Sequence, residues 1–189
     1  MNAGVTEAVY ERLQLRPGNH VLEIGFGNGK LLLSLLARAD DLTYVGLDIA
    51  QTMVAEAVAF NAEHVASGRA TFHLGQAEAI PWDDGSFDRA FAINVFYFWP
   101  APVEALCEMR RVLRPYGTSV VAAVTPEIAM TAPFACAEFG FRTRDGEAIA
   151  ALHHEAGFGQ VRVERYSEVA ARPDGTPWQR HYSIVIAHP

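Results

Sequence analysis

Cysteine is scarce in this sequence, and its scarcity excludes two kinds of stabilising framework. Cys107 and Cys136 are the two cysteines among 189 residues. Such a pair, far apart in the chain, forms neither a multi-disulfide scaffold nor the ligand cluster of a structural zinc site. The seven histidines also lack the spacing of metal ligands. We therefore expect no metal centre.

Positive charge is limited as well, and no basic stripe runs along any segment. The chain has 15 lysines and arginines against 22 acidic residues, which gives a formal net charge of -7. Nucleic-acid-binding domains usually carry a basic face, so nucleic acid is not an expected partner. No apolar run approaches the roughly 20 residues that span a bilayer, and residues 1–4 show no signal-peptide pattern. The expectation is a cytoplasmic protein without a membrane span.

Apart from these absences, the composition is that of one globular domain over residues 1–189, with half of the residues hydrophobic. Apolar periodicity predicts helices over 4–14, 29–38, 50–65, 103–113 and 145–156, and strands over 20–24, 43–48, 70–74, 89–94, 118–124, 161–166 and 182–187. Strands that alternate with helices favour an α/β fold, a doubly wound and mostly parallel sheet with helices on both faces. Residues 167–181 are a poor helix, so the last two of the seven strands should pair antiparallel.

The stretch "VLEIGFGNGK", residues 21–30, leads from a buried strand into three alternating glycines, with Glu23 inside the strand. A strand, glycine loop and helix in succession bring backbone N–H groups to the carboxyl end of a sheet, where ligands bind. The dinucleotide fingerprint needs glycine where this chain has Lys30, and Glu23 would repel a pyrophosphate. An NAD-dependent enzyme is therefore disfavoured. The acid instead favours a cationic ligand without phosphate, such as S-adenosylmethionine.

Four ordered motifs between residues 18 and 124 carry a resemblance to a known family. Residues 23–29 resemble the E/D-x-G-x-G-x-G signature of class I S-adenosylmethionine-dependent methyltransferases, and Asp48 ends the second strand 19 positions after Gly29. Residues 75–98, "GQAEAIPWDDGSFDRAFAINVFYF", and 108–118, "EMRRVLRPYGT", resemble the type-11 group of small-molecule methyltransferases. This resemblance implies a Rossmann-like fold and says nothing about the substrate.

The resemblance also implies which residues bind S-adenosylmethionine and its product S-adenosylhomocysteine. Asp48 would hold the ribose hydroxyls, and Gln76, where the family usually has aspartate, would accept a hydrogen bond from the adenine amino group. The expected cofactor-binding residues are Glu23, Gly25, Phe26, Gly27, Gly29, Asp48, Ile49, Met53, Gln76, Ala77, Glu78, Asn94 and Val95.

Two apolar segments are candidates for the acceptor pocket. Residues 96–99 follow the fourth strand on the ligand side, and are either core packing or pocket wall. Residues 125–143 are rich in phenylalanine, and either cover the substrate or pack on the sheet edge or on a second subunit of a homodimer. The expected pocket residues are Phe96, Tyr97, Trp99, Phe134 and Phe139.

The predicted function is transfer of a methyl group from S-adenosylmethionine to a small, partly apolar molecule, aromatic or lipid-like, by in-line displacement. The sequence identifies no catalytic base. The alternative is a non-catalytic S-adenosylmethionine-binding subunit or regulatory module. It arises because the N-terminal segment, residues 1–17, is short for a family in which that region commonly closes the active site.

Overall fold

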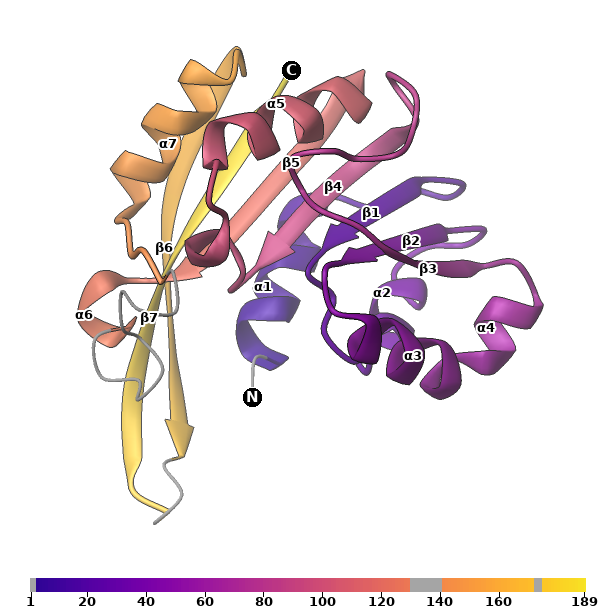
Figure 1. Cartoon of the computed structure of the whole chain (residues 1–189). Helices are drawn as coiled ribbons and strands as arrows, with labels where there is room; N and C mark the ends of the chain where they lie inside the picture. The colour runs from indigo at the N-terminus through magenta and orange to yellow at the C-terminus, as the bar shows by residue number, and fades with distance from the viewer. Residues whose placement is uncertain (1–2, 130–140, 172–174) are drawn as a thin grey trace.

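The protein was analysed as a computed structural model that describes residues 3–129, 141–171 and 175–189. The described residues form one seven-stranded sheet in the order β3-β2-β1-β4-β5-β7-β6 (Figure 1). Strands β1 to β5 are parallel, and β7 runs antiparallel to both β5 and β6, which confirms the predicted fold class. The strands are β1 His20–Ile24, β2 Thr43–Asp48, β3 Ala70–Leu74, β4 Phe87–Ile93, β5 Leu113–Val124, β6 Gln160–Ala171 and β7 Pro177–His188.

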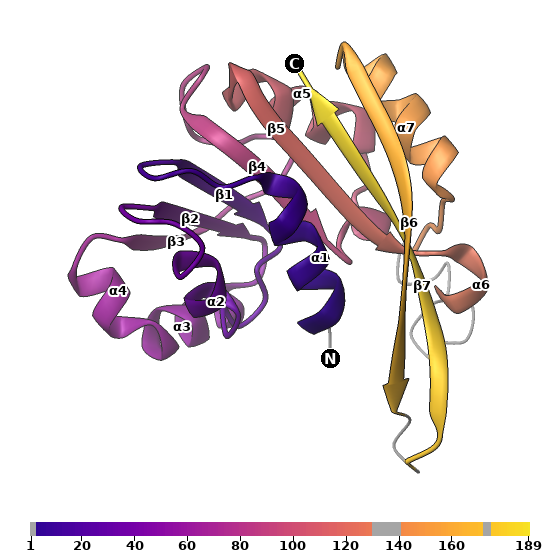
Figure 2. The same ribbon diagram turned by 180° about the vertical axis from the view of Figure 1, so that it is seen from behind.

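Helices cover both faces of the sheet, as Figures 1 and 2 show from opposite sides. Successive strand residues point to opposite faces, so Val120 packs in one core and Val121 in the other. One face is covered by α1 Ala3–Leu13, α2 Leu32–Leu36, α3 Gln51–Phe60 and α4 Ala62–Ala66. The other is covered by η1 Phe96–Phe98, α5 Pro102–Val112 and α7 Gly146–Glu155, while α6 Pro126–Ala129 follows β5. None of the described helices is long and apolar enough to cross a membrane.

Two predicted helices differ from those observed. Helix α2 starts at Leu32 instead of residue 29, because Gly29 has a φ of 66° and is not helical. The helix predicted over 50–65 divides into α3 and α4 at Asn61. The buried Asn61 side chain donates from Nδ2 to the carbonyl oxygens of Gly29, at 3.2 Å, and Ala57, at 2.9 Å. The break thus lets one amide tie the helix to the glycine loop.

The last two strands are longer than the predicted 161–166 and 182–187. Strand β7 pairs with β5 over residues 182–187, whereas its ladder with β6 continues to the pair Ala171 and Pro177. Residues 168–171 and 177–180 therefore form a two-stranded arm, called the β6–β7 arm below. It extends beyond the carboxyl end of β5 (Figures 1 and 2). From Glu164 to Ala171, intermediate and exposed residues alternate along β6, which is the pattern of a strand with one face covered.

Candidate active site

A cavity of about 1580 Å³ lies at the carboxyl end of the parallel strands. The glycine loop and the start of α2 form one wall, and the start of α1 and the β6–β7 arm form another. The volume exceeds the roughly 300–1,000 Å³ of a pocket for one drug-sized ligand. The polar and aromatic lining residues in the described part of the chain are Thr6, Glu23, Phe26, Asn28, Lys30, Asn94, Tyr97, Phe141, Tyr166, Glu168, Trp178 and Arg180.

The glycine loop brings bare backbone to the cavity. Gly25 has a φ of 75°, and a Cβ added there would lie 2.4 Å from Cγ1 of Val95. Gly27 has a φ of 59°, and its missing Cβ would meet no atom within 4 Å, so this residue faces open space. Both positions need glycine because side chains disfavour positive φ. The loop is thus shaped for close approach of a ligand to its backbone.

Glu23 lines the cavity just before this loop. Its Oε2 accepts a hydrogen bond of 2.6 Å from the hydroxyl of Tyr44. Burial raises the pKa of Glu23 to about 7, opposed by the bond from Tyr44 and reinforced by the charge of Asp48. Burial and the charge of Glu23 raise the pKa of Tyr44 well above its ordinary value, so Tyr44 remains a donor. A cation bound beside Glu23 would favour the ionised carboxylate.

Asp48 is the last residue of β2 and lies beside the glycine loop. Its Oδ2 accepts from the backbone N of Gly27 at 3.3 Å, and its Oδ1 accepts from that of Ala50 at 2.9 Å. These bonds fix the carboxylate, which still has lone pairs for two further donors. The structure therefore places Asp48 against the glycine loop.

The residues expected near adenine gather around Asp48, beyond the cavity lining. The backbone N of Gly75 donates to the carbonyl oxygen of Asp48 at 2.9 Å, which brings the exposed Gln76 close to the exposed Ile49. The side chain of Ile49 is 72% exposed, an unusual degree for an isoleucine. Of the remaining expected residues, Met53 of α3 is partly buried against the core on its side of the sheet, Ala77 is buried, and Glu78 is half-buried.

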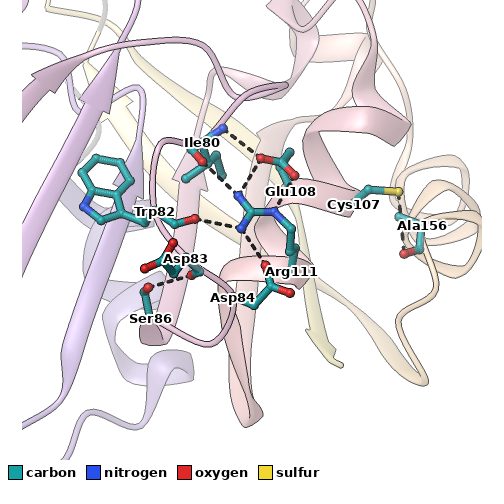
Figure 3. A network of polar contacts seen from close by, with 9 residues as sticks. All are labelled: Ile80, Trp82, Asp83, Asp84, Ser86, Cys107, Glu108, Arg111 and Ala156. Carbon is teal, nitrogen blue, oxygen red and sulfur yellow. Dashed lines mark hydrogen bonds and ion pairs between the residues drawn. The ribbon is translucent and has the colours of Figure 1, made fainter.

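A polar network anchors the loop that carries Gln76 to α5 (Figure 3). The guanidinium of Arg111 donates to the carbonyl oxygens of Ile80, at 2.9 Å, and Trp82, at 2.8 Å. It also bonds to Glu108 and Asp84, and Oε2 of Glu108 accepts from the backbone N of Ile80 at 3.0 Å. The bond to Arg111 lowers the pKa of Glu108. The motif at residues 108–118 thus positions the loop expected to hold adenine.

The aromatic residues after β4 divide between core and cavity. Tyr97 lines the cavity, where burial raises its pKa to about 12, and its ring centroid lies 4.2 Å from that of Phe141. Phe96 and Trp99 pack against each other in the core beside α5 and are not among the lining residues, so their placement gives no support to the pocket role expected of them. Their side chains turn away because the 3-10 turn of η1 sends successive residues in different directions. Phe134 and Phe139 lie outside the described residues.

Asn94 and Val95 line the cavity at the end of β4. Asn94 has a φ of 57°, and its Oδ1 accepts from the backbone N of Val124 at 3.1 Å, so it also has a structural role. Sequence reasoning missed Tyr166, Glu168 and Arg180, whose alternate spacing on β6 and β7 was the available signal. No group of His, Cys, Asp or Glu that could hold a metal ion was found in the described part of the chain.

Residues 22–121 match the family described as "Methyltransferase domain". The methyltransferase GfsG of Streptomyces halstedii is 35% identical over 118 residues, 62% of this chain and 42% of that protein. The O-methyltransferase resE of Aspergillus sclerotiorum is 28% identical over 170 residues, 87% of this chain and 63% of that protein. The chain therefore spans less than two thirds of the length of either relative. Among solved structures, the YcgJ protein of Bacillus subtilis has the same fold, with a TM-score of 0.79, 15% identity and coverage of 98% of both chains.

Proposed function

The chain belongs to the class I S-adenosylmethionine-dependent methyltransferase family, and we propose that it transfers a methyl group from this cofactor to an oxygen atom of a small, partly apolar molecule. The observation that carries the proposal is the position of Glu23 in the cavity, directly before the glycine loop on which Asp48 is fixed. The Glu23 carboxylate attracts the cationic methionine end of the cofactor, and the Asp48 carboxylate binds the ribose. The relative resE, which is an O-methyltransferase, supports oxygen as the acceptor atom.

Each part of the cofactor has a matching group on this chain. The ionised Glu23 attracts the ammonium and sulfonium charges, and the bare backbone at Gly27 lets the methionine end lie close. Asp48 accepts from the ribose hydroxyls with its remaining lone pairs. Ile49 covers the adenine ring, and Gln76 accepts from the adenine amino group. A pyrophosphate on the glycine loop would meet repulsion from Glu23, which lies directly before that loop.

S-adenosylmethionine would supply a methyl group on a positively charged sulfur. On transfer of this methyl group to an acceptor hydroxyl, the carbon–sulfur bond would break, S-adenosylhomocysteine would be left, and the hydroxyl proton would pass to solvent. The chain aligns the acceptor and excludes water from the cavity. Tyr97 and Phe141 form an apolar wall that holds the acceptor. Because the pKa of Tyr97 is raised to about 12, its hydroxyl keeps its proton at neutral pH and acts as a donor, not as a base.

The test is a transfer assay with the purified chain, S-adenosylmethionine carrying a deuterated methyl group, and a panel of hydroxylated aromatic compounds. Mass spectrometry should detect deuterated products together with S-adenosylhomocysteine. Asp48→Ala should abolish turnover, whereas the control Asp83→Ala, at an exposed position on the turn before β4, should leave it unchanged. Cofactor binding without any product over the panel would instead favour the non-catalytic binding module.

A further inference from the structure

The β6–β7 arm forms a wall of the cavity opposite the glycine loop. Strand alternation puts Tyr166, Glu168 and Ala170 of β6 on the same side as Trp178 and Arg180 of β7, and all five line the cavity. The arm lies beyond the carboxyl ends of the parallel strands, near the start of α1 (Figures 1 and 2). An acceptor beside the cofactor's methyl group would therefore lie between the glycine loop and the arm.

An ion pair on the arm is held at the cavity wall. The guanidinium of Arg180 bonds to Oε1 of Glu168, and the hydroxyl of Tyr182 donates to the same oxygen at 3.1 Å. Only 15% of the Arg180 side chain and 12% of the Glu168 side chain are exposed. Charges with so little contact with water are retained in folded proteins when they are paired. The arm thus presents two opposite charges in balance.

The first turn of α1 fixes the position of this pair. Gly4 lies so close to the arm that an added Cβ would be 2.0 Å from Oε2 of Glu168 and 2.9 Å from the hydroxyl oxygen of Tyr166. Both Glu168 carboxylate oxygens are therefore positioned, Oε1 by Arg180 and Tyr182 and Oε2 by the approach of Gly4. The first turn of α1 and the arm thus lie in contact and together form one side of the cavity.

We infer that this side of the cavity selects the acceptor, and that it fits an uncharged, hydroxylated aromatic molecule. The inference rests on the proposed function. The ring of such a molecule would lie against Tyr97, Phe141 and Trp178, which all line the cavity. A hydroxyl group donates to the Glu168 carboxylate and accepts from the Arg180 guanidinium at once, so it satisfies both without separating them.

A charged acceptor is disfavoured by the same pair. A carboxylate drawn to Arg180 would face Glu168, and an ammonium drawn to Glu168 would face Arg180. In a partly water-excluded wall, such like-charge contacts cost more than they do in bulk water. Glu168 and Arg180 are thus specificity-determining residues, placed apart from the groups that hold the cofactor.

The test uses three ligands with one ring and one phenol that differ in charge: para-hydroxybenzyl alcohol, para-hydroxybenzoate and para-hydroxybenzylamine. Their affinities are measured by ligand-observed NMR on the full chain loaded with S-adenosylhomocysteine. The wild type should bind the alcohol about tenfold more tightly than either charged ligand. Glu168→Gln should shift the preference about tenfold toward the benzoate, and Arg180→Gln should shift it similarly toward the amine. Affinity for S-adenosylhomocysteine should remain within about twofold in both variants.

A second variant moves the wall without changing its charges. Gly4→Ala pushes on Glu168 and Tyr166 and should weaken binding of the alcohol several-fold. The matched control is Gly159→Ala, where the nearest atom to the added Cβ is the carbonyl oxygen of Pro189 at 3.8 Å, and it should bind like the wild type. Thermal unfolding of all variants checks that they are folded.

The results separate the two claims. Equal affinities for the three ligands, no detectable ligand binding, or a charge preference that both arm variants leave unchanged would overturn the inference while the proposed function stands. If S-adenosylhomocysteine itself does not bind, the proposed function fails and this inference fails with it.

Discussion

Acidification should weaken cofactor binding through Glu23. The pKa of this carboxyl is raised to about 7 in the ligand-free protein, chiefly by burial. A cationic methionine end binds the ionised form, so the proton must leave before or during binding. If only the ionised form of Glu23 binds the cofactor, the apparent dissociation constant equals that of the ionised protein multiplied by (1 + 10^(pKa − pH)). Between about pH 8 and pH 5.5 this is roughly a 30-fold loss of affinity, or about 2 kcal/mol.

Isothermal titration calorimetry with S-adenosylmethionine across this pH range measures the effect. Glu23→Gln should bind more weakly than the wild type at pH 8 and should show a much flatter pH dependence. In Tyr44→Phe the bond that stabilises the ionised carboxylate is lost, so the pKa of Glu23 rises and the affinity midpoint moves to higher pH. Titrations near pH 6.5 in buffers of different ionisation enthalpy should show protons released on binding.

The reasoning is refuted if wild type and Glu23→Gln lose affinity in parallel on acidification. It is also refuted if Tyr44→Phe moves the midpoint to lower pH. Protonation of the cofactor's own amino group cannot imitate the predicted loss, because acid increases that positive charge and should strengthen attraction to a carboxylate.

Substitutions at Asp48, Gln76 and Arg111 test other parts of the site. Asp48→Ala should lower affinity for S-adenosylmethionine more than tenfold in calorimetry, since it removes hydrogen bonds to a charged acceptor worth about 1.5–3 kcal/mol each; unchanged affinity would exclude the ribose assignment. Gln76→Leu should cost about 1 kcal/mol of binding and Gln76→Asp should bind at least as well as wild type; a Leu variant of full affinity would remove this residue from the adenine site. Arg111→Ala strands the carbonyl oxygens of Ile80 and Trp82 and should destabilise the fold by about 1–3 kcal/mol, lowering the melting temperature by several degrees. A melting temperature equal to that of the wild type would show that the network is dispensable.

The sheet and the glycine loop were predictable because their signals are local. Strands β1, β2 and β3 have the predicted bounds, since each is a short apolar run between turn residues. Glu23 lies one residue before the end of β1 and Asp48 ends the adjacent parallel strand β2, and such ends meet at one edge of a sheet. Their proximity follows from the topology alone.

Other features depend on contacts between distant segments. The periodicity of the helix predicted over 50–65 passes through Asn61 without interruption, and only the contact of Asn61 with Gly29 explains the break. The β6–β7 arm was missed because residues 173–177, "PDGTP", contain two prolines and a glycine, which are weak strand signals. On this arm, Glu168 lies against Gly4, a residue more than 160 positions away in the chain.

The central claim is that the cavity beside Glu23 and Asp48 binds S-adenosylmethionine and not a nicotinamide dinucleotide. Titration of S-adenosylhomocysteine and of NAD into the purified wild-type chain tests it most directly. The account predicts saturable, one-to-one binding of S-adenosylhomocysteine that Asp48→Ala weakens more than tenfold, and no measurable binding of NAD. Binding of NAD, or the absence of S-adenosylhomocysteine binding to folded protein, would contradict it.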